Sequence, residues 1–179
     1  MSKAVMLSIR PKWVEKIASG EKTIEVRKTK PKLDTPFKCY IYCTLPKYPH
    51  EDFIATDYPR PQFYGGGKVI GEFICDRCCG IVCVGFDGVT GLTREDLEAY
   101  LAGGEGYGWH ISNLKIYDAP KKLGEFWRDC LEYSELSTNC WSCENICGDG
   151  DETDCNTDGR LYLRRPPQSW CYVEEMKDG

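Results

Sequence analysis

The stretch KTIEVRK near the N-terminus alternates between apolar and polar side chains. Successive side chains of a β-strand point to opposite faces, so this stretch predicts a strand with Ile24 and Val26 packed into the core. Thr23, Glu25 and Arg27 would then share the other face. A face with charges of both signs fits either the wall of a polar cleft or a solvated surface strand, where ion pairs contribute little stability.

The rest of the chain predicts many strands and few helices. Pro11 suits the first turn of a short helix that contains Trp13 and stops at Gly20. A second short helix follows Thr93, which forms a capping pair with Asp96. Strand-like stretches surround both: AVMLSI, FKCYIYCT, GKVIGEFICDRCCGIVCVGF, GYGWHISNLKIYD and SWCYVEE. Strands and helices do not alternate regularly, which favours one α+β domain over all 179 residues, built on a small mixed β-barrel.

Charge is unevenly distributed along the chain. Residues 1–38 contain ten Lys and Arg against four Asp and Glu, although the whole chain has a net charge of −5. This balance argues against bulk, non-specific nucleic-acid binding and predicts that an anionic ligand lies near the N-terminal segment. The start of the chain lacks the apolar segment of a signal peptide, and no apolar run has the length of a membrane span. We therefore expect a cytoplasmic protein without a membrane partner.

The order of helix, glycine and charged strand resembles the ASCH domain, a branch of the PUA-like superfamily. The residues that carry the resemblance are Gly20, Lys22, Glu25, Arg27 and Pro31, preceded by the short helix with Trp13. A second matching stretch is YGWHI, where an aromatic strand leads to YDAP. The resemblance extends from about residue 4 to residue 120 and includes the final strand.

The resemblance implies a small PUA-like β-barrel of five or six strands with short flanking helices and a cleft between barrel and helices. Relatives of that fold bind RNA or hold a single modified base in the cleft. Lys22, Thr23, Glu25 and Arg27 would then contact the ligand. Arg27 offers a planar fork of donors to a phosphate or a base edge, Glu25 accepts from an exocyclic amine, and Lys22 supplies a positive point charge.

Trp109 and His110 complete the predicted ligand-binding set. A base stacked on Trp109 would gain about 1–3 kcal/mol, and His110 would act as a donor or as a general acid or base. Neighbouring residues of a strand point to opposite faces, so the two side chains do not share one role. The alternative is that Trp109 belongs to the core of the barrel and His110 is a paired polar group.

A catalytic reading of the same residues is the main alternative to binding. One branch of ASCH proteins consists of amidohydrolases that act on acetylcytidine, and the resemblance places its catalytic lysine at Lys22. Its catalytic threonine corresponds to Glu25, and a carboxylate in place of a hydroxyl nucleophile requires a different mechanism. We therefore expect a domain that binds RNA, a nucleotide or a modified nucleoside. The alternatives are a hydrolase or ribonuclease that uses Lys22 and Glu25, and a protein-interaction module.

Residues 129–159 differ in composition from the rest of the chain. They contain nine Asp and Glu, no Lys or Arg, and too few apolar residues for a core of their own. We interpret them as a Cys-rich acidic insertion into the domain. Cys140, Cys143, Cys147 and Cys155 have the close spacing of thiolate ligands at a structural zinc site. The alternative is a reduced loop without metal.

Zinc content tests this interpretation. Nine acidic side chains without a basic partner repel one another, and a structural zinc ion offsets that repulsion because it drives local folding by about 10 kcal/mol. Protein purified without chelator should contain about one equivalent of zinc by elemental analysis. Chelation should expose residues 129–159 to limited proteolysis and spare the barrel. Metal-free protein in which this segment already resists the protease would contradict the prediction.

Overall fold

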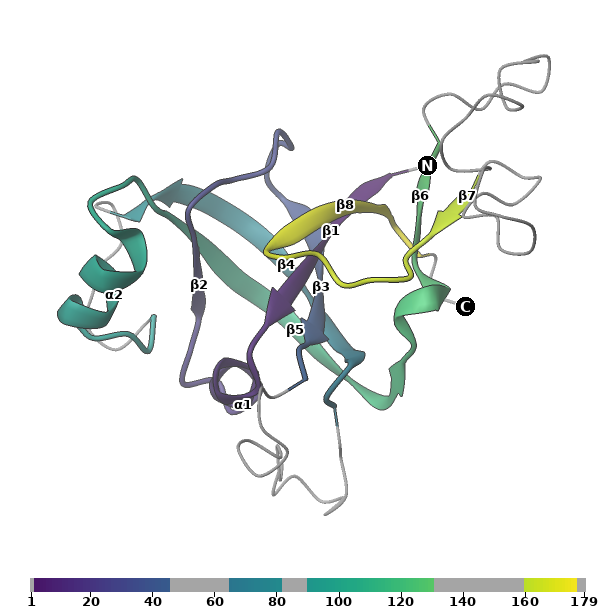
Figure 1. The fold of residues 1–179 in the computed structure, drawn as a ribbon, viewed down its shortest axis with the longest axis horizontal. Coiled ribbons are helices and arrows are strands. Elements are labelled where there is room, and N and C mark those ends of the chain that lie inside the picture. Colours follow the sequence, from purple (N-terminus) through teal and green to yellow (C-terminus); the bar gives the residue numbers. More distant parts are fainter. Residues whose placement is uncertain (1, 46–64, 82–89, 131–159, 177–179) are drawn as a thin grey trace.

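The structure is a computed structural model, and it describes residues 2–45, 65–81, 90–130 and 160–176. Its main element is a six-stranded sheet with the order β2-β5-β4-β3-β1-β8 (Figure 1). The strands are β1 (Lys3–Ile9), β2 (Ile24–Arg27), β3 (Phe37–Cys43), β4 (Lys68–Gly80), β5 (Tyr107–Lys121) and β8 (Trp170–Glu174). Strands β1 and β3 run parallel, and the other neighbouring pairs run antiparallel.

Strands β4 and β5 curl the sheet into a half-barrel. Their register shifts at three places, and such irregularities bend a strand and increase its twist. Gly71 lies at one of these shifts, where an added Cβ would come within 2.5 Å of the carbonyl oxygen of Lys115. Glycine is therefore required for the close approach of the two backbones. The curl leaves β2 and β8 as the two edges of the sheet, on either side of an open seam.

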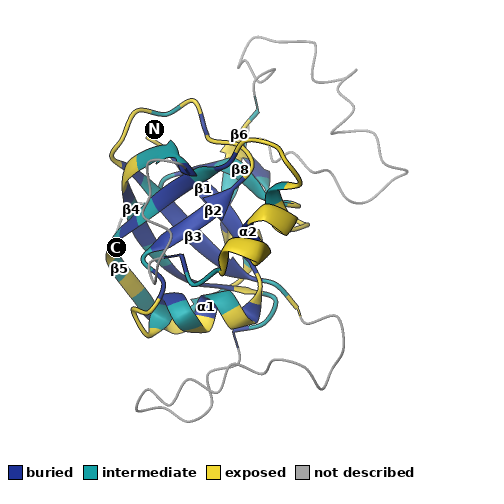
Figure 2. Ribbon diagram, turned by 90° about the vertical axis from the view of Figure 1, so that its left-hand side faces the viewer, coloured by how far each residue is buried: buried dark blue, intermediate teal, exposed yellow. Residues whose placement is uncertain are grey.

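The main core fills the inside of the half-barrel. Its buried residues include Val5, Leu7, Ile9, Cys39, Ile41, Phe73, Cys75 and Trp109. Helix α1 (Pro11–Ala18) packs Val14 and Ile17 against this core. Figure 2 shows the inner strands as buried, whereas the outer faces of the helices are exposed. The predicted start and end of α1 are confirmed: the helix begins at Pro11, and Gly20 follows its end with a φ of +81°.

Helix α2 (Arg94–Leu101) covers the outer face of β2. The side chain of Thr93 caps it by accepting a 3.1 Å hydrogen bond from the backbone N–H of Asp96, as predicted. Ile24 and Val26 pack beneath it in a separate small cluster with Leu97. The prediction that these two residues pack into the barrel is therefore wrong. The apolar face of β2 is covered by α2, and its charged face points into the half-barrel.

A two-stranded sheet lies beside the half-barrel. It pairs β6 (Trp127–Asp129) with β7 (Arg160–Tyr162), after a 3-10 turn at Leu123–Glu125 (η2). Asp129, at the start of the predicted acidic insertion, is therefore paired with Arg160, the first described residue after it. The predicted zinc ligands at positions 140, 143, 147 and 155 lie outside the described residues, so the zinc site stays a prediction. Neither α-helix in the described part of the chain is long and apolar enough to cross a membrane.

Trp109 is part of the main core, and its predicted role as a stacking platform is wrong. Its exposed fraction is 0%, and its ring contacts those of Phe37 and Trp170 at centroid distances of 5.7 and 5.9 Å. A ring enclosed in this way offers no face to a ligand. His110 points to the opposite, outer face of β5, where its Nδ1 lies 2.6 Å from the Asp76 carboxylate. The alternative interpretation of both residues matches their positions.

A stability measurement separates the two neighbours. Trp109→Ala should lower the free energy of unfolding by about 3–5 kcal/mol, because it leaves a large cavity in the core. His110→Ala should cost about 1 kcal/mol or less, because it removes only an exposed pair. Chemical denaturation of both variants checks the difference, and a similar loss of stability in the two would contradict it.

Candidate functional site

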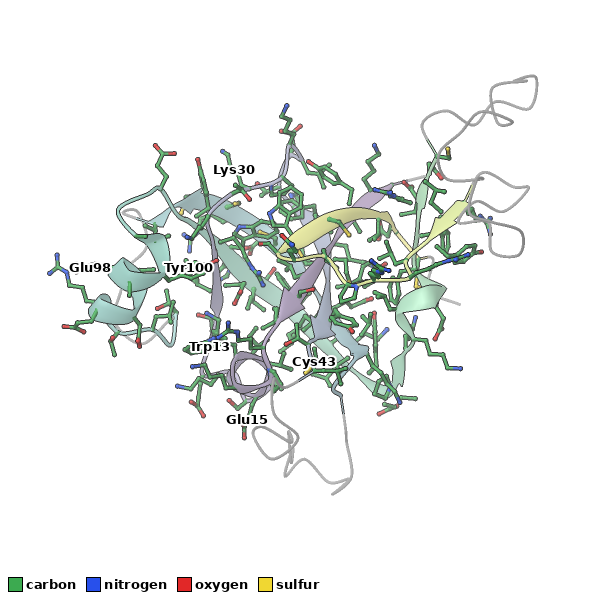
Figure 3. All side chains as sticks on the ribbon, in the orientation of Figure 1. Trp13, Glu15, Lys30, Cys43, Glu98 and Tyr100 are labelled. Carbon is green, nitrogen blue, oxygen red and sulfur yellow. The ribbon has the colours of Figure 1, made fainter. Side chains whose placement is uncertain are left out.

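A pocket of about 500 Å³ lies at the open seam of the half-barrel. Its walls come from the end of β1, the start of α1, β2 and Lys22 before it, helix α2 and the residues that precede β8, with Thr44 and Leu92 adding to the lining. Its lining includes the polar and aromatic residues Ser8, Arg10, Lys12, Trp13, Lys22, Glu25, Arg27, Asp96, Tyr100, Gln168 and Ser169. Figure 3 labels Trp13 on α1 and Tyr100 on α2, two of the residues that line the pocket.

Arg27 crosses the seam from β2 to the opposite edge of the sheet. Its Nη2 donates to the carbonyl oxygen of Ser8 at 2.8 Å, and its Nη1 donates to the carbonyl and hydroxyl oxygens of Ser169 at 3.2 and 3.3 Å. The residue is 7% exposed. Its Nε is buried and has no hydrogen-bond partner among the residues that the structure describes. An unused donor on a buried guanidinium is costly unless a ligand completes it.

Two further side-chain contacts hold the seam beside Arg27. The indole N–H of Trp170 donates to the hydroxyl of Thr29 at 3.0 Å. The backbone N–H of Lys32 donates to the hydroxyl of Tyr172 at 2.7 Å. Both contacts join the segment after β2 to β8, so side chains make the connection that backbone pairing makes elsewhere in the sheet.

Lys22 is a buried ammonium with all three N–H donors in use. Its Nζ donates to the carbonyl oxygens of Ile24 and Thr90 at 2.7 and 2.6 Å and lies 3.3 Å from the carboxylate of Glu25. The residue is 2% exposed. Burial lowers the pKa of Lys22 below its usual value, and the Glu25 carboxylate opposes that shift. The contact with Thr90 ties the segment before α2 to the start of β2.

Glu25 joins the two cations into one network. Its Oε2 faces Lys22, and its Oε1 lies 3.0 Å from Nη2 of Arg27. Glu25 is 7% exposed, and the two positive charges beside its carboxylate offset the cost of burying it. A carboxylate oxygen can accept two hydrogen bonds, so Glu25 has acceptor capacity left for a ligand donor.

The pocket as a whole is moderately basic. Its lining contains four basic side chains, Arg10, Lys12, Lys22 and Arg27, and two acidic ones, Glu25 and Asp96. An excess of two positive charges suits a ligand with one phosphate or carboxylate better than a neutral one. Four of the ten Lys and Arg of residues 1–38 therefore line the pocket.

Two aromatic side chains on the walls were not predicted as site residues. Trp13 is half-buried, and Lys12 and Lys22 lie 4.7 and 5.4 Å from its ring centroid. Tyr100 is 40% exposed although its position in α2 suggests an inward side chain. Gln168 and Ser169 also reach the pocket from far along the sequence. Helical spacing signals Trp13 and Tyr100 only as core residues, so no sequence pattern singles them out.

The structure brings together only part of the predicted ligand-binding set. Lys22, Glu25 and Arg27 line the pocket, whereas Thr23, Trp109 and His110 do not. Thr23 contributes its backbone carbonyl to a 2.8 Å hydrogen bond from the N–H of Ile111. Within the described residues, no group of three or more His, Cys, Asp or Glu side chains is placed to hold a metal ion.

Solved structures with the same architecture come from ASCH proteins. The crystal structure of ASCH from Zymomonas mobilis has a TM-score of 0.55 and 16% sequence identity, and the match covers 96% of this chain and 88% of that chain. The crystal structure of a Ser-to-Ala variant of that protein has a TM-score of 0.55 and 15% sequence identity, with 96% of this chain and 89% of that chain covered. The structure of a Tyr-to-Phe variant has a TM-score of 0.50 and 18% sequence identity, with 68% of this chain and 77% of that chain covered.

These matches establish the fold. The chain has an ASCH-like fold, a curled half-barrel sheet with two short helices, which confirms the α+β PUA-like prediction. At 15–18% identity the likeness concerns the fold alone. Neither a family model nor a curated protein matches the sequence. The properties of the pocket must therefore be argued from its own residues.

Removal of Lys22 tests the buried network. Lys22→Met should lower the free energy of unfolding by about 3–5 kcal/mol, because the Glu25 carboxylate and two buried carbonyl groups lose a partner. Lys68→Met is a matched control on an exposed lysine and should change stability by about 0.5 kcal/mol or less.

A double variant makes the test specific to the ion pair. Adding Glu25→Gln to Lys22→Met should cost less than the sum of the two single changes, because the uncompensated carboxylate is removed. Denaturation midpoints of the four proteins measure the coupling. Strictly additive losses would contradict the pairing of Lys22 with Glu25.

Proposed function

We propose that the pocket binds a nucleotide, either free or as one residue of an RNA chain. The observation that carries the proposal is Arg27, a buried guanidinium at the pocket wall with one donor that has no partner in the described part of the chain. The adjacent Glu25 offers acceptor capacity on the same wall. A donor beside an acceptor is the pattern needed to pair with the polar edge of a base.

The other walls support the same ligand. A volume of about 500 Å³ lies within the range of small-molecule sites. Trp13 and Tyr100 provide aromatic surface for a base, while Arg10 and Lys12 at the start of α1 provide charge for a phosphate. The amide of Gln168 adds a donor and an acceptor from the opposite side. The likeness to ASCH structures agrees with this proposal, since the ASCH resemblance implies RNA or base binding.

Binding fits the geometry better than hydrolysis. A catalytic Lys22 would need a free amine, but its three donors point to Ile24, Thr90 and Glu25. Glu25 is paired on both oxygens and stands where the related amidohydrolases have a hydroxyl nucleophile. We therefore assign Lys22 to positioning: it holds Glu25 and the segment before α2.

The test of the proposal uses Arg27 and a distant arginine of equal charge. Arg27→Gln should weaken the binding of a nucleoside monophosphate about tenfold or more, because a hydrogen bond to a charged donor contributes about 1.5–3 kcal/mol. Arg27→Lys should keep the charge but recover only part of the affinity, because it lacks the planar fork. Arg77→Gln makes the same charge change at an exposed position of β4 outside the pocket and should bind as the wild type does.

Calorimetric titration at fixed salt, with thermal melts to verify folding, measures these affinities. Equal affinity of the Arg27→Gln and wild-type proteins would contradict the proposal. Turnover of acylated nucleosides by the wild type, lost in Glu25→Gln, would favour the hydrolase instead.

A further inference from the structure

Two cysteines of β4 face the same side of the sheet because the strand carries a bulge between them. Cys75 and Cys78 are three positions apart, so in a regular strand they would point to opposite faces. In the pairing of β4 with β5, Cys75 is opposite Ile111. Cys78 is opposite Trp109, so β4 advances three residues where β5 advances two. Directly opposite residues share a face, and the bulge therefore turns both cysteines toward the main core.

The residues between the two cysteines form the outer side of this bulge. Asp76 and Arg77 are exposed and have no register partner in the described pairing of β4 with β5. The Asp76 carboxylate lies 2.6 Å from Nδ1 of His110, which fixes the bulge to the outer face of β5. A disulfide brings two sulfur atoms to about 2.05 Å, and the locally interrupted ladder of a bulge permits the small backbone movement that this requires.

The two sulfur atoms already interact. The Sγ of Cys75 lies 3.4 Å from the carbonyl oxygen of Arg77 and within hydrogen-bonding reach of the Cys78 sulfur. The hydrogen bond from Cys75 lowers the pKa of Cys78, burial opposes that shift, and the positive charge of Lys30 adds to it. The same hydrogen bond, together with burial, raises the pKa of Cys75. Of the two thiols, Cys78 is therefore the one that forms a thiolate.

The two cysteines also differ in their access to solvent. Cys75 is 0% exposed, whereas Cys78 is half-buried and close to the exposed Lys30. A partly exposed thiolate beside a cation is typical of a reactive cysteine, and a fully buried thiol is inert until a partner reaches it. The next residue, Cys79, is also half-buried, but it packs against the small cluster beneath α2 on the other face of the sheet.

A third cysteine faces the same core from the neighbouring strand. Cys39 of β3 is 0% exposed, and burial raises its pKa well above the usual value. As stated above for metal ions, the described residues contain no group of three such side chains placed to hold one. Cys39 is therefore a packing residue, and Cys75 and Cys78 remain as a pair of thiols.

We propose that Cys75 and Cys78 are a redox-active dithiol that hydrogen peroxide converts into a disulfide, with Cys78 as the attacking residue and Cys75 as the resolving one. This inference goes beyond the proposed function and does not depend on it. The bulge supplies the shared face, the difference in access sets the order of the two steps, and the oxidant is small enough to reach a half-buried sulfur.

The reaction has two balanced steps. The Cys78 thiolate attacks one oxygen of the peroxide: an S–O bond forms, the O–O bond breaks, and hydroxide leaves and takes a proton from the solvent. The product is a sulfenic acid. The Cys75 sulfur then attacks the sulfur of Cys78: the S–S bond forms, the S–O bond breaks, and the hydroxyl group leaves with the Cys75 proton as water. The two thiols lose two electrons, and the peroxide that gains them becomes two water molecules.

Peptide mapping of the full chain tests the linkage directly. Reduced protein freed of reductant is treated with about one equivalent of hydrogen peroxide, alkylated, and digested with trypsin without reductant. Trypsin cleaves after Arg77, so Cys75 lies on the peptide of residues 69–77 and Cys78 on that of residues 78–94. These two peptides should appear joined, and fragmentation should place the bond on Cys78 rather than on another cysteine of its peptide. Dithiothreitol should restore both free thiols.

Three variants separate the roles of the cysteines. Cys78→Ser should abolish the linkage, whereas Cys79→Ser, a matched change at the neighbouring half-buried position, should form it as the wild type does. Cys75→Ala removes the resolving thiol, so a sulfenic acid should persist on Cys78 and react several-fold more with a 1,3-diketone probe than in the wild type. Thermal melts verify that this core variant folds, and the mapping of the wild type does not depend on it.

Three results would overturn the inference. The first is complete alkylation of Cys75 and Cys78 after the peroxide treatment. The second is a bond from either cysteine to the peptide of residues 39–47, which contains Cys39. The third is a linkage of Cys75 that still forms in Cys78→Ser. None of these results depends on nucleotide binding, so the proposed function stands or falls separately.

Discussion

The arrangement of the half-barrel depends on how its open seam is held together. Strands β2 and β8 are the edges of the curled sheet, and Arg27 spans the space between them to reach Ser8 and Ser169. A side chain of this length keeps the edges apart, which leaves the pocket between them. The guanidinium is buried by the same geometry, so it needs a negative partner. Glu25 supplies that partner, and Lys22 balances Glu25 in turn.

This chain of pairings explains how an acidic protein can have a basic site. Most charge inside the pocket is compensated within it, so the wall is rigid and its remaining donors and acceptors have fixed directions. Selection among ligands then depends on geometry at the wall. The other two basic residues of the lining, Arg10 and Lys12, are exposed at the start of α1, where they attract anions without the cost of burial.

The predictions that held concern local features. The alternation in β2 placed Glu25 and Arg27 on one face, and Thr93 marked the start of α2, because strand parity and capping depend on residues a few positions apart. The predictions that were wrong concern which face of a strand points into the half-barrel. Ile24 and Val26 pack under α2, and Trp109 is enclosed in the core. In YGWHI, alternation puts Tyr107, Trp109 and Ile111 on one face and only Gly108 and His110 on the other, so the pattern itself favours Trp109 as a core residue.

The sequence by itself determined the α+β class, the two short helices, the charged face of β2 and the basic character of the N-terminal segment. Each follows from composition or from contacts within one element. Only the tertiary structure decided that the charged face points inward, that Tyr100 and Ser169 join the pocket, and that His110 pairs with Asp76 outside it. Ser169 lies 142 positions from Arg27, and their contact exists because β4 and β5 curl the sheet until its edges approach. No local periodicity encodes that curl, since it results from the summed bends of paired strands.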